Sequence, residues 1–164
     1  MSIANQHGPV GPLLAGFAGA LALTALHETA RRIVPNPPRM DTLGRRALAR
    51  GLRLVGSEPP PRGELQAVTL TGDVLSNGLM YAAAVGFGSP ESALVRGAAV
   101  GAVAGLGAVL LPPVMGLGPG PAGQPIETRL MTVAWYTFGG VVAAEVYRRL
   151  RPAAPPGAWL MGKG

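Results

Sequence analysis

An acidic residue interrupts a long apolar segment in the middle of the chain. Asp73 is followed by Asn77 and Tyr81 at intervals of four residues, so a helix would place these three side chains on one face, one turn apart. An aspartate at the centre of a membrane helix costs about 2.5–3.5 kcal/mol on insertion scales, and such residues usually mark a site. The spacing predicts a polar intramembrane site, which either carries protons or cations or holds helices together by hydrogen bonds.

Two further polar side chains are expected near Asp73. If the apolar segments enter the membrane at their arginine-flanked ends, His27 and Tyr136 fall in the same half of the bilayer as Asp73, as judged from the rise of 1.5 Å per helical residue. Either of them, or Arg31 or Arg129, is a candidate partner for the carboxylate. The simpler interpretation is structural, with His27 at the interface and Tyr136 as a packing aromatic.

The composition excludes several kinds of catalytic and metal site. The chain has no cysteine, which rules out disulfides, thiolate catalysis and cysteine-based metal centres. His27 and Glu28 are adjacent and cannot share a helix face, and Ser76 has no neighbouring base. We predict no catalytic residue, no metal and no cofactor. A membrane-embedded enzyme or haem protein that uses His27 is the least favoured alternative.

The hydropathy pattern predicts an all-α, polytopic integral membrane protein. Of 164 residues, 48% are hydrophobic and 13% are charged, against about 25% charged in soluble chains. Four apolar segments, each near the roughly 20 residues that span a bilayer, are found at 10–31, 65–87, 94–111 and 130–147. We expect Pro112 and Pro113 to end the third segment, which leaves open whether it crosses fully.

These segments are expected to form one transmembrane domain over residues 1–151, followed by a flexible tail at 152–164. The connection 32–64 is long and rich in arginine. Within it, Asp41 or Thr42 is a candidate N-cap for a short amphipathic helix that ends near Val55. This basic helix is predicted either to lie on anionic headgroups or to pack as a solvated helix on the end of the bundle. The arginines expected to contact headgroups are Arg45, Arg46, Arg50 and Arg53.

The distribution of arginines also predicts orientation and location. Thirteen arginines and one lysine give a formal net charge of +6, and this preference for arginine is typical of a high-GC bacterial genome. The positive-inside rule places the connection 32–64 in the cytoplasm and both termini outside, although Arg148 and Arg149 oppose the outside location of the C-terminus. Because the arginines flank apolar segments, we predict the bacterial cytoplasmic (inner) membrane and no nucleic-acid partner.

Helical spacing predicts local contacts as well. Glu28 is four residues from Arg32, and Glu145 is three and four residues from Arg148 and Arg149, so each glutamate is expected to form ion pairs along its own helix.

A ridge of small residues runs along the third apolar segment. Gly97, Gly101 and Gly105 recur every four residues, which lets another helix backbone approach closely in a membrane. The approaching helix is predicted to belong either to this chain or to a second copy.

Three functions fit these features, in order of preference. The first is a non-enzymatic interaction subunit or scaffold that packs through the glycine ridge and contacts membrane lipids, as a homo-oligomer or within a larger membrane complex. The second is a transporter or ion-translocation component in which Asp73, Asn77 and Tyr81 line the route. The third is the enzyme or haem protein described above. No motif in the chain indicates a known activity.

Overall fold

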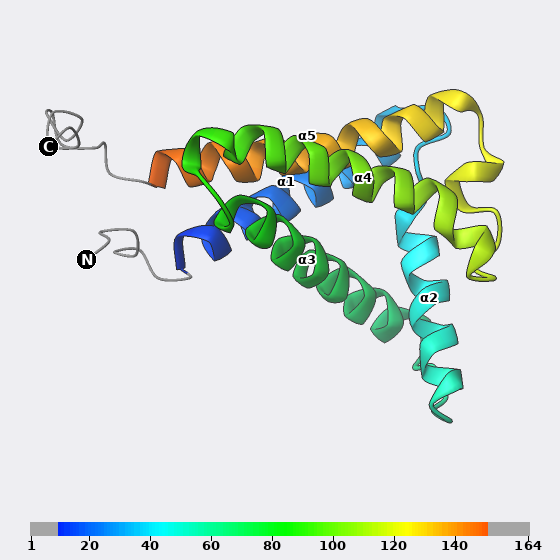
Figure 1. The fold of residues 1–164 in the computed structure, drawn as a ribbon. Helices are drawn as coiled ribbons and strands as arrows, with labels where there is room; N and C mark the ends of the chain where they lie inside the picture. Colours follow the sequence, from blue (N-terminus) through cyan, green and yellow to red (C-terminus); the bar gives the residue numbers. More distant parts are fainter. Residues whose placement is uncertain (1–9, 151–164) are drawn as a thin grey trace, which may run out of the picture.

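The computed structural model describes residues 10–150, and in this range the secondary structure is helical, without strands. Four long helices alternate in direction, and a shorter helix crosses one end of them (Figure 1). In chain order the elements are α1 (Val10–Ile33), α2 (Met40–Leu54), α3 (Arg62–Gly86), the 3-10 turn η1 (Pro90–Ser92), α4 (Ala93–Val114), the 3-10 turn η2 (Gly120–Gly123) and α5 (Ile126–Leu150). The all-α prediction is confirmed for these residues. The tail predicted at 152–164 lies outside them.

The four predicted apolar segments coincide with α1, α3, α4 and α5 to within a few residues. Two stretches in the described part of the chain are long and apolar enough to cross a membrane, namely α1 and Pro90–Val114. Helices α3 and α5 have 25 residues each, or roughly 37 Å of helix, but they are less apolar. The structure therefore contains two candidate membrane spans, fewer than the four predicted.

Glycines bring the long helices into close contact. A Cβ atom added to Gly97, Gly101 or Gly105 of α4 would lie 2.4–2.6 Å from a backbone atom of α5. On α1, a Cβ at Gly16 would meet the backbone of α3, and one at Gly19 would meet the backbone of α5. Helix α1 is thus packed against both α3 and α5, and the glycine ridge of α4 contacts α5 of the same chain.

Helix α3 is packed along only part of its length. Its buried residues all lie in its second part and are Asn77, Gly78, Tyr81, Ala82, Ala84 and Val85. Towards its N-terminal end, α3 diverges from the other long helices and approaches α2 (Figure 1). We call α1, α4, α5 and residues 77–86 of α3 the packed region, and α2 with residues 62–76 of α3 the open region.

The end of α4 differs from the prediction. The helix continues through Pro112 and Pro113 to Val114, so the stop expected at the prolines is wrong. The amides of Gly116 and Leu117 donate to the carbonyls of Pro113 and Pro112 at 3.1 and 2.9 Å, and Gly116 has a φ of +66°. This is a Schellman motif, which closes a helix after its last turn. Prolines in that turn remove amide donors but leave the closing bonds intact.

An arginine closes the end of α3 that adjoins α4. Arg96 donates hydrogen bonds to the carbonyls of Ala84, Val85 and Ser89 at 3.0, 3.3 and 2.8 Å. The last carbonyls of a helix have no partner within it, so this side chain supplies the missing donors. Helical spacing within α4 gave no indication of this contact, because the acceptors belong to the preceding helix and turn.

Candidate functional site

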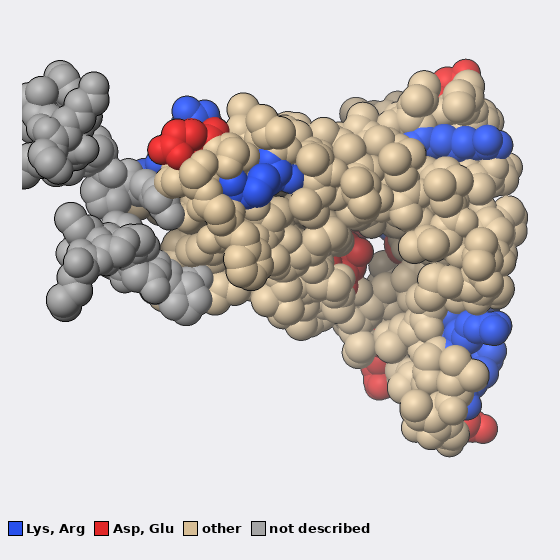
Figure 2. Space-filling model, viewed as in Figure 1, with Lys and Arg blue, Asp and Glu red and all other residues tan. Residues whose placement is uncertain are grey.

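A cavity of about 340 Å³ lies between α1, α2 and α3, where α3 diverges from the bundle. Figure 2 shows the molecule hollowed between the long helices and α2, with acidic side chains beside the hollow. Most of the cavity wall is apolar, with Met40, Leu48, Val68 and Leu70 among its lining residues. We call this space the three-helix cavity.

Asp73 lies on the α3 side of the three-helix cavity. The amide Nδ2 of Asn77 donates to Asp73 Oδ1 at 3.1 Å, and Asn77 also interacts with the side chain of Tyr136 on α5. None of the ion pairs within residues 10–150 includes Asp73. The carboxylate therefore reaches Tyr136 through Asn77, and no guanidinium neutralises it.

His27 contributes a buried ring from α1. The residue is 8% exposed, and its ring centroid lies 5.1 Å from that of Trp135 and 6.2 Å from that of Tyr136, in edge-on geometry. These aromatic contacts fix the ring against α5. Its Nε2 atom has no hydrogen-bond partner among the residues that the structure describes, and the residue lines the three-helix cavity. His27 and Asp73 thus share one cavity, with no hydrogen bond between them.

Tyr81 and Asn77 face the packed region instead. Tyr81 is fully buried, and its hydroxyl donates to the backbone carbonyl of Tyr136 at 2.7 Å. Neither residue is part of the cavity wall. Of the three residues that the four-residue spacing placed on one helix face, only Asp73 lines the cavity.

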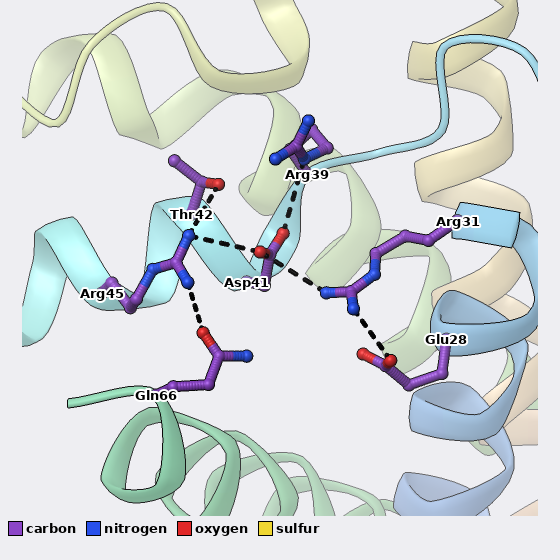
Figure 3. A network of polar contacts seen from close by, with 7 residues as sticks. All are labelled: Glu28, Arg31, Arg39, Asp41, Thr42, Arg45 and Gln66. Atoms are coloured by element: carbon purple, nitrogen blue, oxygen red, sulfur yellow. Dashed lines mark hydrogen bonds and ion pairs between the residues drawn. The ribbon is translucent and has the colours of Figure 1, made fainter. Parts of the chain in front are cut away.

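Asp41 is the centre of an ion-pair network at the start of α2 (Figure 3). Its carboxylate lies 3.4 Å from Arg31, 3.7 Å from Arg39 and 3.3 Å from Arg45. The predicted N-cap role is wrong for both candidates, because Arg39 occupies the N-cap position and no side chain caps the helix. Charge-assisted bonds to guanidinium groups are stronger than bonds to neutral amides, which accounts for the direction of the Asp41 side chain.

The same network joins α2 to both neighbouring helices. Arg31 of α1 bonds to Glu28 at 3.0 Å as well as to Asp41, whereas the sequence predicted that Glu28 would pair with Arg32. Arg45 of α2 donates to the side-chain oxygen of Gln66 on α3. Figure 3 shows the side chains pointing towards one another from the three helices. They hold the open region at a fixed separation from α1.

A second, larger cavity is lined by arginines. It has a volume of about 780 Å³ and lies between α2, the start of α3 and the segment after α4. Its lining includes Arg45, Arg46, Arg50, Arg53, Arg62, Leu54, Leu65 and Leu117. We call it the arginine groove.

The arginines of this groove differ in their partners. Arg45 belongs to the network just described, and Arg46 donates to the carbonyl of Leu117 at 3.2 Å. Arg50, Arg53 and Arg62 are exposed and make no hydrogen bond or ion pair with the residues that the structure describes. Two of the four arginines predicted to contact headgroups therefore bind within the chain. Arg62 joins the other two, although it follows a proline run and lies outside the amphipathic pattern of the basic helix.

The remaining predicted contacts are distributed at the ends of the helices. Glu145 forms its predicted pairs with Arg148 and Arg149, at 3.4 and 2.8 Å. Arg129, a candidate partner of Asp73, instead donates to the carbonyl of Gln124 at 3.0 Å.

Over residues 10–150, no three histidine, aspartate or glutamate side chains are grouped so that they could hold a metal ion. Comparison of the chain with protein families, curated proteins and solved structures finds no match.

Proposed function

We propose that this chain is a multi-pass protein of the bacterial cytoplasmic membrane, in which α1, α3, α4 and α5 cross the bilayer and α2 lies at the cytoplasmic headgroups. Large apolar side chains remain exposed on all four long helices, including Leu21, Leu79, Val103 and Phe138. Most of the charged side chains visible in Figure 2 gather towards the ends of these helices. An apolar belt between two charged ends suits a bilayer environment.

The proposed function is that of a non-enzymatic interaction subunit or scaffold, held in place by anionic phospholipid. The observation that supports it is the set of guanidinium groups of Arg50, Arg53 and Arg62 around the arginine groove, which have no partner in the described part of the chain. Guanidinium groups bind phosphate in bidentate fashion, and each basic residue near an anionic membrane surface contributes about 1 kcal/mol of attraction. Leu54 and Leu65 beside them offer contacts for the start of an acyl chain.

The test is lipid retention by the purified protein. In native mass spectrometry from mild detergent, the protein should retain phosphatidylglycerol in preference to phosphatidylcholine. The triple variant Arg50→Gln/Arg53→Gln/Arg62→Gln should lose most of that preference, because the anionic headgroup loses its guanidinium partners. Arg32→Gln is a matched control, since Arg32 is exposed at the end of α1 and does not line the groove.

Two results would contradict the proposal. An unchanged lipid preference in the triple variant would show that the arginine groove does not bind the lipid headgroup. Release of the protein from membranes by alkaline carbonate would remove the transmembrane assignment itself.

Ion translocation is the second candidate function, and one observation favours it. Asp73 lines the three-helix cavity without a cationic partner among residues 10–150, as a proton- or cation-carrying carboxylate would. Proteoliposomes with the parent protein should then show a proton or cation flux that Asp73→Asn abolishes. A parent protein without flux eliminates this candidate and leaves the scaffold.

A further inference from the structure

We infer that the three-helix cavity binds a small organic amine, a molecule with one ammonium group and an apolar body. The inference does not depend on the proposed lipid-held scaffold, since it rests on a cavity within the chain rather than on its surroundings. Three properties of the cavity lead to it: the unpartnered polar atoms in its wall, the charge of Asp73 and the apolar remainder of its lining.

The first property is that hydrogen-bonding groups without partners converge on this cavity. Among the described residues, the buried side-chain polar atoms without a hydrogen-bond partner are Thr24 Oγ1, His27 Nε2, Asp41 Oδ1 and Thr69 Oγ1. All four belong to residues that line the three-helix cavity. Asp41 Oδ1 lies 3.7 Å from Arg39 Nε in an ion pair, so the three atoms without any partner are Thr24 Oγ1, His27 Nε2 and Thr69 Oγ1. A buried polar atom without a partner costs about 1–3 kcal/mol, and folded proteins contain few of them. Their gathering around one cavity is the arrangement of a binding site whose ligand supplies the missing bonds.

The second property is a carboxyl group without a cationic partner among the described residues. The cavity wall carries Glu28, Asp41 and Asp73. The first two are paired with Arg31, whereas Asp73 receives only the neutral amide of Asn77. A carboxylate withdrawn from water is stabilised best by a cation with which it also forms a hydrogen bond. The ligand is therefore expected to be positively charged.

The third property distinguishes an organic cation from a metal ion. Calcium and magnesium require six or more oxygen ligands, or retained water, whereas no three acidic or histidine side chains of the described residues are grouped so that they could hold a metal ion, and the cavity lining includes Leu48, Val68 and Leu70. The volume of about 340 Å³ falls within the roughly 300–1,000 Å³ of small-molecule sites. An apolar body fits this wall, and an anionic lipid headgroup is disfavoured by Asp73.

An ammonium group also supplies the donors that the unpartnered acceptors lack. It carries up to three N–H donors, and the acceptors come from facing helices, with Thr24 and His27 on α1 and Thr69 and Asp73 on α3. His27 Nε2 accepts a hydrogen bond when the ring proton is on Nδ1. A ligand bound there would link α1 to the part of α3 that the fold leaves unpacked.

The test compares three indole compounds of similar size on the full-length protein in lipid nanodiscs. Tryptamine is the amine, indole-3-ethanol its neutral analogue and indole-3-acetate an anion. In isothermal titration calorimetry, with empty nanodiscs subtracted, tryptamine should bind saturably and about tenfold or more tightly than the alcohol, because only its ammonium group brings a positive charge to the hydrogen bond with Asp73. The anion should not bind.

The variant Asp73→Asn should abolish the preference for tryptamine over the alcohol. Glu145→Gln removes one carboxylate from the end of α5, outside the cavity wall, and should leave the preference unchanged. Equal binding of amine and alcohol by the parent protein, or an unchanged preference in Asp73→Asn, overturns the inference.

A second variant keeps the test decisive if Asp73→Asn does not fold. Leu48→Trp on α2 places a large apolar side chain in the cavity and leaves Asp73 intact. Its tryptamine binding should fall at least about tenfold through loss of space, while its circular dichroism and lipid retention stay those of the parent. Unchanged tryptamine binding in this variant overturns the placement of the ligand, and the lipid retention reports separately on the arginine groove.

Discussion

The packed region and the open region share one helix, α3, yet they are held together in different ways. In the packed region, glycines allow backbones to touch, as where a Cβ on Gly101 would lie 2.4 Å from the Tyr136 carbonyl. In the open region, contacts pass through long side chains, as where Arg45 reaches Gln66. Small residues let helices pack without gaps, whereas long polar side chains bridge helices that lie farther apart. Both large cavities described above border the open region for that reason.

The largest expected effect comes from enlarging a glycine of the packed region. Gly101→Leu should prevent formation of a stable, monodisperse protein, and Gly101→Ala should already cost about 1–3 kcal/mol or more through overpacking. Thermal unfolding in detergent measures both. The sequence left open whether the ridge contacts this chain or a second copy, and the expected damage follows from the contact with α5 of the same chain.

Two matched glycines sharpen that result. Gly107 lies on the same helix, and a Cβ atom added there would have its nearest neighbour at 3.5 Å. Gly72 lies in the open region, and an added Cβ atom would have no neighbour within 4 Å. Alanine at either position should be neutral or stabilise the protein by up to about 1 kcal/mol, because alanine favours a helix over glycine. Equal loss of stability in Gly101→Ala and Gly72→Ala would contradict the division into two regions.

An intermediate effect is expected from the ion-pair network of the open region. Asp41→Asn removes the charge that three arginines share and should destabilise the docking of α2 by about 1–3 kcal/mol. Trypsin should then cut faster at Arg53 and Arg62, which flank the connection between α2 and α3. Glu145→Gln disrupts two exposed pairs and should cost about 1 kcal/mol or less. Equal loss of stability in the two variants would show that the burial of Asp41 does not strengthen its ion pairs.

The smallest effect is expected from a single hydroxyl in the packed region. Tyr81→Phe keeps the buried ring and removes one hydrogen bond to the Tyr136 carbonyl, at a cost of about 0.5–1.5 kcal/mol. Tryptamine binding should remain unchanged, because Tyr81 does not line the three-helix cavity. A loss of binding as large as that in Asp73→Asn would mean that the two regions act as one site.

The sequence predicted those features that depend on spacing along one helix. Apolar run lengths located α1, α3, α4 and α5, and intervals of three and four residues located the pairs of Glu145. The four-residue interval also marked Gly97, Gly101 and Gly105 as a surface for close approach, although it could not identify which helix approaches. Each of these is a local regularity, readable without knowing the arrangement in space.

Features that depend on how helices diverge were not predictable in this way. The position of Asp41 suggested a helix cap, but its partners come from α1 and α2 together. Asp73, Asn77 and Tyr81 share a helix face, yet they have different surroundings because α3 leaves the bundle between them. The two cavities likewise arise from that divergence, which no residue interval encodes.

The position of α1 has a consequence for biogenesis. Gly19 of α1 meets α5, while Gly16 meets α3, so the first described helix to leave the ribosome finds one of its two neighbours only after the last has been made. Until then the side of α1 that carries Gly19 has no partner among the described helices. Chains emerge N-terminus first during synthesis, so a nascent chain arrested before α5 leaves this side uncovered. Completion of α5 is therefore the step that closes the packing around α1.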